Sequence, residues 1–319
     1  MWVRIYKSLW IRSNENPAPT LVGAGLCYAN WMDILPQLVA NSVIAGSLYA
    51  ILTLGFNLTY GTAKFIDMSY GVLTAVGGYS VFYFSKMLGL PLPLGILLGL
   101  LFGGLVSFLA YTFVYQPLRR RKASSAVLLI ASLGVFTALQ AAIAMFFTSQ
   151  FQTLSGLISA NRSFEFLGGT MTAVQLGILG VGTLLFAGLV LLIKQTLFGK
   201  ALTAIGDDEE VAQIVGINTD QIVGRVFFLS GAIGALAGIL VGFDTGIEPV
   251  MGLPLLLSAI VAAIVGGIGN VSGGVAGAFL LAFAENFGIW KISGEWKSAI
   301  AFSILILFLV FRPKGLFPK

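Results

Sequence analysis

One run of acidic side chains interrupts an otherwise apolar chain: Asp207, Asp208, Glu209 and Glu210. In a short helix that begins at Asp207, these carboxylates would lie in the first turn, where unpaired backbone N–H groups and the helix dipole favour negative charge. The residues that follow are Val211, Ala212, Ile214, Val215 and Gly216. Val211, Ile214 and Val215 would share one helix face, and Gly216 is typical of a helix C-terminus. Because a helix this short is marginal alone in water, its apolar face predicts a packing partner, which could be another protein.

The sequence lacks the side chains that most catalytic and metal sites need. It contains no histidine and one cysteine, Cys27, which excludes an intramolecular disulfide, a histidine-based zinc site and a Ser–His or Cys–His pair. Gly199 and Lys200 resemble part of a Walker A motif, but that motif needs glycine at Lys194 and serine or threonine at Ala201. We therefore expect no catalytic residue, no metal site and no cofactor in this chain, and an intramembrane enzyme is the least favoured function.

A second polar interruption, residues 60–71, separates two apolar runs. Ionisable groups within hydrocarbon are candidates for function, and helices broken near the middle of the membrane build many transporter sites. The candidates for a translocation pathway are Asn57, Tyr60, Asp67 and Ser69. The alternative for Asp67 is an ion pair with Lys64 at the edge of a loop.

Membrane-spanning helices must position these residues. Of 319 residues, 57% are hydrophobic and 10% are charged, whereas a soluble domain is about 25% charged. Apolar runs such as 174–193 reach the roughly 20 residues that a helix needs to cross a bilayer, and they lack the alternation of barrel strands. The sequence predicts one all-α domain, a bundle of about eight or nine spans over residues 34–319. The predicted spans lie near 35–60, 70–89, 92–115, 125–148, 173–194, 220–243, 254–269, 271–289 and 297–312.

Basic residues predict the orientation of this bundle. Lysine and arginine at 118–124 and 312–319 favour the cytoplasm, and the acidic run, within the loop 195–218, returns to that side. Three spans before residue 118 would place the N-terminus outside, although its first residues are basic. Either one early segment re-enters without crossing, or residues 1–33 hold an amphipathic surface helix and a linker. The net charge of +5 reflects this placement and does not predict nucleic-acid binding.

Glycines recur at four-residue spacing. The rows are Gly95, Gly99 and Gly103; Gly234, Gly238 and Gly242; and Gly269, Gly273 and Gly277. In lipid, small residues at this spacing let helix backbones approach closely. The rows therefore predict direct packing of helices in a compact bundle.

Several stretches resemble one protein family. Glu210, Val211, Ala212 and then Gly216 are similar to the EAA-xxx-G loop of bacterial ABC importer permeases, with Val211 in place of the first alanine. The wider stretch 200–218 resembles that loop in branched-chain amino acid permeases of the LivH type. Three further stretches resemble the same family in the same order, although the first has Tyr70 where the family usually has histidine: 54–79, 263–285 and 311–317.

The resemblance implies an ABC importer permease fold in the bacterial cytoplasmic (inner) membrane. Residues 207–216 would form a coupling helix in a groove of a cytoplasmic ATPase, with the acids meeting basic residues there and the apolar face filling the groove. The implied assembly contains a second homologous permease, two ATPase subunits that bind ATP and Mg²⁺, and an extracytoplasmic substrate-binding protein.

The chemical class of the transported solute is predicted from the charged residues and from the resemblance. No run of arginines suits a phosphate and no carboxylate ladder suits a proton relay, which favours a small neutral or zwitterionic solute. The resemblance implies branched-chain or other neutral amino acids, with urea or short amides as the alternative in a similar subgroup. A secondary transporter or channel is the alternative from a different class, and it would need an ion-coupling residue within a span.

Overall fold

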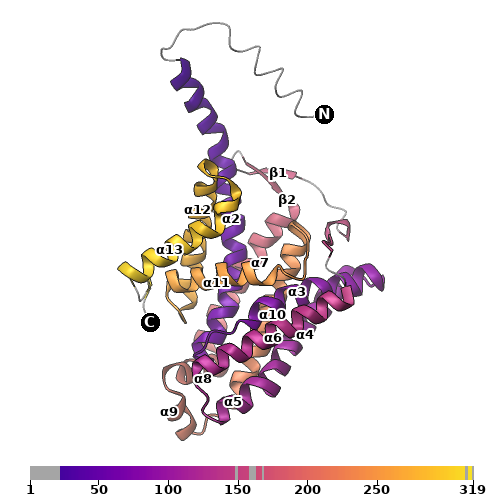
Figure 1. Cartoon of the computed structure of the whole chain (residues 1–319), viewed down its shortest axis with the longest axis vertical. Coiled ribbons are helices and arrows are strands. Elements are labelled where there is room, and N and C mark those ends of the chain that lie inside the picture. The colour runs from indigo at the N-terminus through magenta and orange to yellow at the C-terminus, as the bar shows by residue number, and fades with distance from the viewer. Residues whose placement is uncertain (1–21, 148–149, 158–162, 167–168, 313–314, 318–319) are drawn as a thin grey trace.

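The computed structural model describes residues 22–147, 150–157, 163–166, 169–312 and 315–317. Figure 1 shows a helical bundle with a small hairpin at one end and two short helices at the other. The helices are α2 (Val22–Ala63), α3 (Ser69–Val81), α4 (Leu92–Ala110), α5 (Gln116–Arg120), α6 (Ser125–Phe147), α7 (Ala173–Gln195), α8 (Leu197–Asp207), α9 (Glu209–Ile214), α10 (Thr219–Asp244), α11 (Gly252–Gly266), α12 (Val271–Lys291) and α13 (Lys297–Phe311). The strands β1 (Ser163–Phe166) and β2 (Gly169–Thr172) pair antiparallel.

Among the described residues, seven helices are long and apolar enough to cross a membrane. They are α2 from Ile34, α4 continued to Arg120, α6, α7, α10, α12 and α13 with its preceding turn. Two further predicted spans coincide with α11, an apolar helix of 15 residues, and with α3 and its π-helical continuation to Met87. The predicted all-α membrane bundle is confirmed, whereas the β1–β2 hairpin lies between spans, where no element was predicted.

The helices approach most closely where glycines face a neighbouring backbone. A Cβ added to Gly238 of α10 would meet the carbonyl oxygen of Thr74 in α3, and a Cβ on Gly77 would meet the backbone of Ala235. Because α3 and α10 touch backbone to backbone, neither position has room for a side chain.

The predicted row on α12 is only partly helical. A Cβ on Gly273 would meet the Gly266 carbonyl of α11, and one on Gly277 would meet the Ala262 carbonyl. Gly269, predicted to extend this row, lies instead in the loop before α12 with a φ of +80°. The chain must reverse between α11 and α12, and glycine adopts this left-handed conformation without strain.

Three helices, α2, α3 and α4, precede the basic loop at 118–124. The start of α2 and this loop lie at opposite ends (Figure 1). Gln37 of α2 donates to the Thr170 carbonyl of the hairpin at 3.2 Å, whereas Ala63 packs near Tyr115 at the other end. α2 therefore crosses the bundle, whereas α3 with its π-helical continuation is not among the seven candidate spans of the described residues. α2 begins at Val22, so the boundary predicted at residue 33 falls inside a helix. Residues 1–21, with most of the predicted amphipathic helix and linker, lie outside the described residues.

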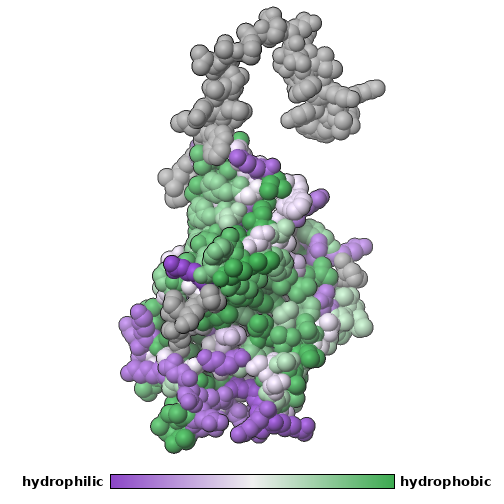
Figure 2. All heavy atoms as spheres, turned by 60° about the vertical axis from the view of Figure 1, so that its left-hand side comes forward, coloured by the Kyte–Doolittle hydropathy of each residue, from purple (hydrophilic) through white to green (hydrophobic). Residues whose placement is uncertain are grey.

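Polar side chains mark one end of the bundle. Figure 2 shows apolar side chains over the middle of the visible face and hydrophilic ones gathered at the end that carries α5, α8 and α9. Arg119, Arg120, Arg121 and Lys122 belong to this end. By the positive-inside rule it faces the cytoplasm.

Candidate functional site

The acidic run lies at the junction of α8 and α9. Asp208 has an extended backbone (φ −152°, ψ 114°), and its side chain accepts hydrogen bonds from the N–H groups of Glu210 (2.9 Å) and Val211 (3.1 Å). The helix that was predicted to begin at Asp207 therefore begins at Glu209, and Asp207 is the last residue of α8. The predicted start was wrong because an N-cap needs a non-helical backbone, and Asp208 is the residue that adopts it.

Gly216 terminates α9. Its φ is +88°, a left-handed conformation in which glycine is favoured. The N–H groups of Gly216 and Ile217 donate to the carbonyls of Gln213 and Ala212, each at 3.0 Å, which satisfies the free end of the helix. A Cβ at Gly216 would have no neighbour within 4 Å, so backbone conformation, and not crowding, favours glycine here.

The two faces of α9 differ in exposure. Ala212 is 2% exposed and packs in a cluster with Tyr115 and Phe227. The residues of the opposite face are exposed by 54% (Val211), 84% (Ile214) and 69% (Val215). Because this apolar face lies at the charged end of the bundle, it is the kind of exposed surface that binds another protein.

One ion pair fastens this loop to α5, and a second joins α5 to the start of α10. Arg119 Nη2 lies 2.7 Å from each carboxylate oxygen of Glu209, with the two side chains 11% and 38% exposed. Arg120 donates from Nε and Nη2 to Asp220 Oδ2 at 3.0 and 2.9 Å. Glu209 therefore has its basic partner within the chain, where the sequence led us to expect a basic residue of an ATPase.

The turn between α2 and α3 centres on a buried carboxylate. Asp67 is 2% exposed, and its Oδ1 accepts hydrogen bonds from the Ser69 N–H (2.9 Å), the Ser69 hydroxyl (2.6 Å) and the Tyr115 hydroxyl (3.0 Å). Burial raises the pKa of the Asp67 carboxyl, and these hydrogen bonds partly oppose the shift. Lys64 is exposed, and no ion pair joins it to Asp67 in the described part of the chain, so the alternative of a loop-edge ion pair was wrong.

The predicted break between helices is present from Ala63 to Ser69, but it lies at the cytoplasmic end and not near mid-membrane. The Phe65 ring packs edge-on against Tyr115 with centroids 5.2 Å apart. Tyr115 and Arg119 are four residues apart, so they project from the same side of one continuous helical segment. This segment therefore contacts the α2–α3 turn through Tyr115 and the α8–α9 loop through Arg119.

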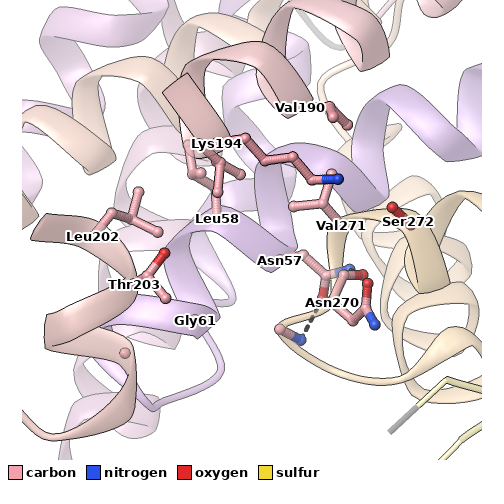
Figure 3. A pocket seen from close by; sticks show the side chains of 13 residues that line it. Asn57, Leu58, Gly61, Val190, Lys194, Leu202, Thr203, Asn270, Val271 and Ser272 are labelled. Carbon is pink, nitrogen blue, oxygen red and sulfur yellow. Dashed lines mark hydrogen bonds between the residues drawn. The ribbon is translucent and has the colours of Figure 1, made fainter. Parts of the chain in front are cut away.

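The other two pathway candidates lie elsewhere. Asn57 accepts a hydrogen bond from the Gly269 N–H (3.1 Å) and donates to the Asn270 carbonyl (3.2 Å). It lines a pocket of about 280 Å³ between α2, the α7–α8 segment and the start of α12 (Figure 3). The Tyr60 ring stacks on Phe56 with centroids 6.2 Å apart. The four candidates therefore do not form one group.

Sequence reasoning did not select Tyr115 or Arg119 as site residues. Tyr115 lies at the end of an apolar run, and Arg119 was used only to predict the orientation of the bundle. A similar case is Glu285 in α12, which is 1% exposed, accepts a hydrogen bond from the Tyr49 hydroxyl at 2.7 Å and lies 3.6 Å from Lys297 Nζ. A tyrosine or arginine next to a membrane boundary is common, so nothing local distinguishes these residues.

Comparisons with known proteins agree with this architecture. Residues 38–309 match the family described as branched-chain amino acid transport system / permease component. The high-affinity branched-chain amino acid transport system permease protein BraD of Pseudomonas aeruginosa is 32% identical over 88% of this chain and 95% of its own length. Permease protein LivH of Escherichia coli is 29% identical over 88% and 94%.

A solved structure shares the fold. PsaBC from Streptococcus pneumoniae, in complex with Fab, superposes with a TM-score of 0.51 and 15% identity, covering 91% of this chain and 98% of its own. At that identity the likeness shows the fold alone. The family match spans nearly every predicted membrane helix and includes α8 and α9. The chain therefore belongs to the branched-chain amino acid transport system permease family and is a multi-pass permease subunit of an ABC importer.

Proposed function

We propose that this permease imports branched-chain amino acids and is driven through α9 by a cytoplasmic ATPase. The observation that carries the proposal is the apolar face of Val211, Ile214 and Val215, which is exposed among charged residues at the cytoplasmic end. Burying such a face gains roughly 25 cal/mol per Å² of apolar surface removed from water, so it favours docking into a groove.

The contacts of α9 allow a movement of this helix to be passed on to α5. A cap at Asp208 and a left-handed turn at Gly216 fix both ends of α9, and Glu209 holds it to Arg119. A helix fixed in this way moves as a unit, so displacement of its exposed face reaches α5 and the turn that Tyr115 contacts. In this proposal, residues 207–216 couple the ATPase to the membrane helices. The turn that contains Asp67 and Ser69 moves when α9 is displaced.

The names of the relatives support the proposed substrate class. BraD and LivH are named as branched-chain amino acid permeases, and a neutral or zwitterionic cargo fits a chain whose one arginine run, 119–121, lies outside the predicted spans. The proposed assembly adds a second homologous permease, two ATPase subunits that supply ATP and Mg²⁺ binding, and an extracytoplasmic binding protein. This chain itself binds no cofactor in that scheme.

The test is uptake of radiolabelled leucine into proteoliposomes that hold the assembled transporter. We expect uptake to require the binding protein and ATP, and to be lost in the double variant Ile214→Asp with Val215→Asp. The control, Ile214→Leu with Val215→Ile, keeps the face apolar and should retain uptake.

Other outcomes separate the alternatives. Gradient-driven uptake by this chain alone, without ATP, would identify a secondary transporter or channel. Competition by urea or acetamide, but not by valine or isoleucine, would assign the amide subgroup.

A further inference from the structure

The pocket that Asn57 lines combines one cation with apolar walls. Leu58, Val190, Ile193 and Leu202 contribute aliphatic surface, and Lys194 contributes the positive charge. Figure 3 shows the Lys194 side chain extending from α7 across the pocket, with its amino nitrogen toward Val271 at the start of α12. No acidic residue lines the pocket, and Lys194 forms no ion pair with another residue of the described chain.

Polar groups that suit an anion line the same pocket as Lys194. The N–H groups of Val271 and Ser272 belong to the first turn of α12, where backbone donors have no acceptor within the helix. Asn270 caps the next donor, since its Oδ1 accepts from the Gly273 N–H at 3.1 Å. A positive side chain, free backbone donors and the N-terminus of a 21-residue helix all favour negative charge.

The size and position of the pocket limit its ligand. Its volume of about 280 Å³ lies near the lower end of the roughly 300–1,000 Å³ that small-molecule sites occupy. Lys194 and Ser272 are exposed, so the pocket opens to the surface at the cytoplasmic end, beside α8. A small solute with a carboxylate and a short aliphatic side chain fits these walls.

We propose that this pocket is a cytoplasmic-side binding site for a small aliphatic carboxylate, with Lys194 as the carboxylate-binding residue. The proposal rests on the proposed function, because the imported amino acid is such a carboxylate and reaches this side after transport. No carboxylate lines the pocket to pair with an ammonium group, so the ligand's amino group contributes little. The site therefore also accepts the matching 2-oxo acid.

The experiment measures equilibrium binding of radiolabelled leucine to the assembled transporter in phosphatidylcholine nanodiscs, without binding protein. We expect saturable binding that falls at least about tenfold in Lys194→Gln, because the variant loses a charge-assisted hydrogen bond to the carboxylate. Lys200→Gln is the matched control, since Lys200 is an exposed lysine of α8 that does not line the pocket. Unlabelled 4-methyl-2-oxopentanoate should compete, whereas leucinamide, which lacks the carboxylate, should not.

A second variant fills the pocket without crowding the backbone. A Cβ at Gly61 would meet only the Gly269 Cα, at 4.0 Å, so Gly61→Ala should keep binding while Gly61→Ile blocks it at an unchanged melting temperature. Unaltered binding in Lys194→Gln, or equal competition by leucinamide, would overturn the proposal.

Two further outcomes would also overturn it. One is the absence of saturable leucine binding in a transporter whose ATP-driven uptake is intact, which leaves the proposed function standing. The other is loss of leucine binding when phosphatidylglycerol replaces part of the phosphatidylcholine, which assigns the pocket to a lipid headgroup.

Discussion

The α9 loop and the α2–α3 turn lie at the same end of the molecule, but their carboxylates differ in exposure and in the origin of their hydrogen-bond partners. In α9 the acids lie at the surface, and the cap comes from a neighbouring residue, Asp208. In the turn, Asp67 is 2% exposed, and one partner, Tyr115, comes from a segment 48 residues away. A segment that is held by contacts within itself can unfold locally. A segment that is held by contacts with distant parts of the chain unfolds only when the whole bundle unfolds. The difference predicts which substitutions act locally and which act globally.

The largest effect is expected at Asp67. Asp67→Ala removes the acceptor of the Ser69 N–H and of the Ser69 hydroxyl, at a cost of about 3 kcal/mol in the free energy of unfolding. The Tyr115 hydroxyl keeps the Ser69 hydroxyl oxygen as an acceptor at 2.8 Å. Asp67→Asn retains one acceptor oxygen and should cost about 1 kcal/mol. Thermal unfolding of the detergent-solubilised protein measures both. Equal losses in the two variants would show that the hydrogen bonds do not hold the turn.

The same position predicts a pH dependence. Burial raises the pKa of Asp67, so the folded protein holds this proton more tightly than the unfolded chain, whose pKa is about 3.9. The free energy of unfolding should therefore fall as pH rises from that value through the folded pKa. Asp67→Asn should remove this part of the slope, and an unchanged slope would contradict the assignment.

The Arg119–Glu209 pair joins the two regions and should give the next largest effect. Arg119→Glu places two carboxylates together where the arginine is 11% exposed, at a cost of about 2 kcal/mol. Adding Glu209→Arg should restore much of the loss, and a double-mutant cycle gives the coupling energy.

The matched control is the Arg120–Asp220 pair, in which the arginine is 67% exposed. It should show a smaller coupling energy, because solvent screens an exposed pair. Equal coupling energies at the two pairs would show that burial of Arg119 does not strengthen its link to α9.

Local signals explain what the sequence predicted well. Hydropathy located the spans, and the glycine after a short amphipathic run located the end of α9, because both signals lie within one segment. The start of α9 was misplaced, since Asp207 and Asp208 are equally good caps by residue type. The partners of Asp67 and Asn57 could not be predicted, because Tyr115 and Asn270 reach them only through packing of distant helices.

Gly216→Val should disturb α9 alone. A β-branched residue at a φ of +88° costs about 1.5 kcal/mol, and Gly216→Asn should cost less, because asparagine tolerates that conformation. In the assembled transporter, the valine variant combined with Glu210→Lys should leave ATP hydrolysis by the ATPase subunits intact but reduce leucine uptake per ATP, while the melting temperature of the permease stays unchanged. Full uptake in that double variant would remove α9 from the coupling route.

The smallest effect is expected at the cap itself. Asp208→Ala frees the N–H groups of Glu210 and Val211 and should cost α9 about 1 kcal/mol. Their hydrogen exchange should speed up by roughly fivefold, and Asp208→Asn, which can still cap, should restore protection. Hydrogen exchange of the Ser69 amide measures opening of the α2–α3 turn, because this amide donates a hydrogen bond to Asp67. If its exchange also speeds up in Asp208→Ala, the loop and the turn open as one unit, and Arg119 transmits the loss of a local cap into the bundle.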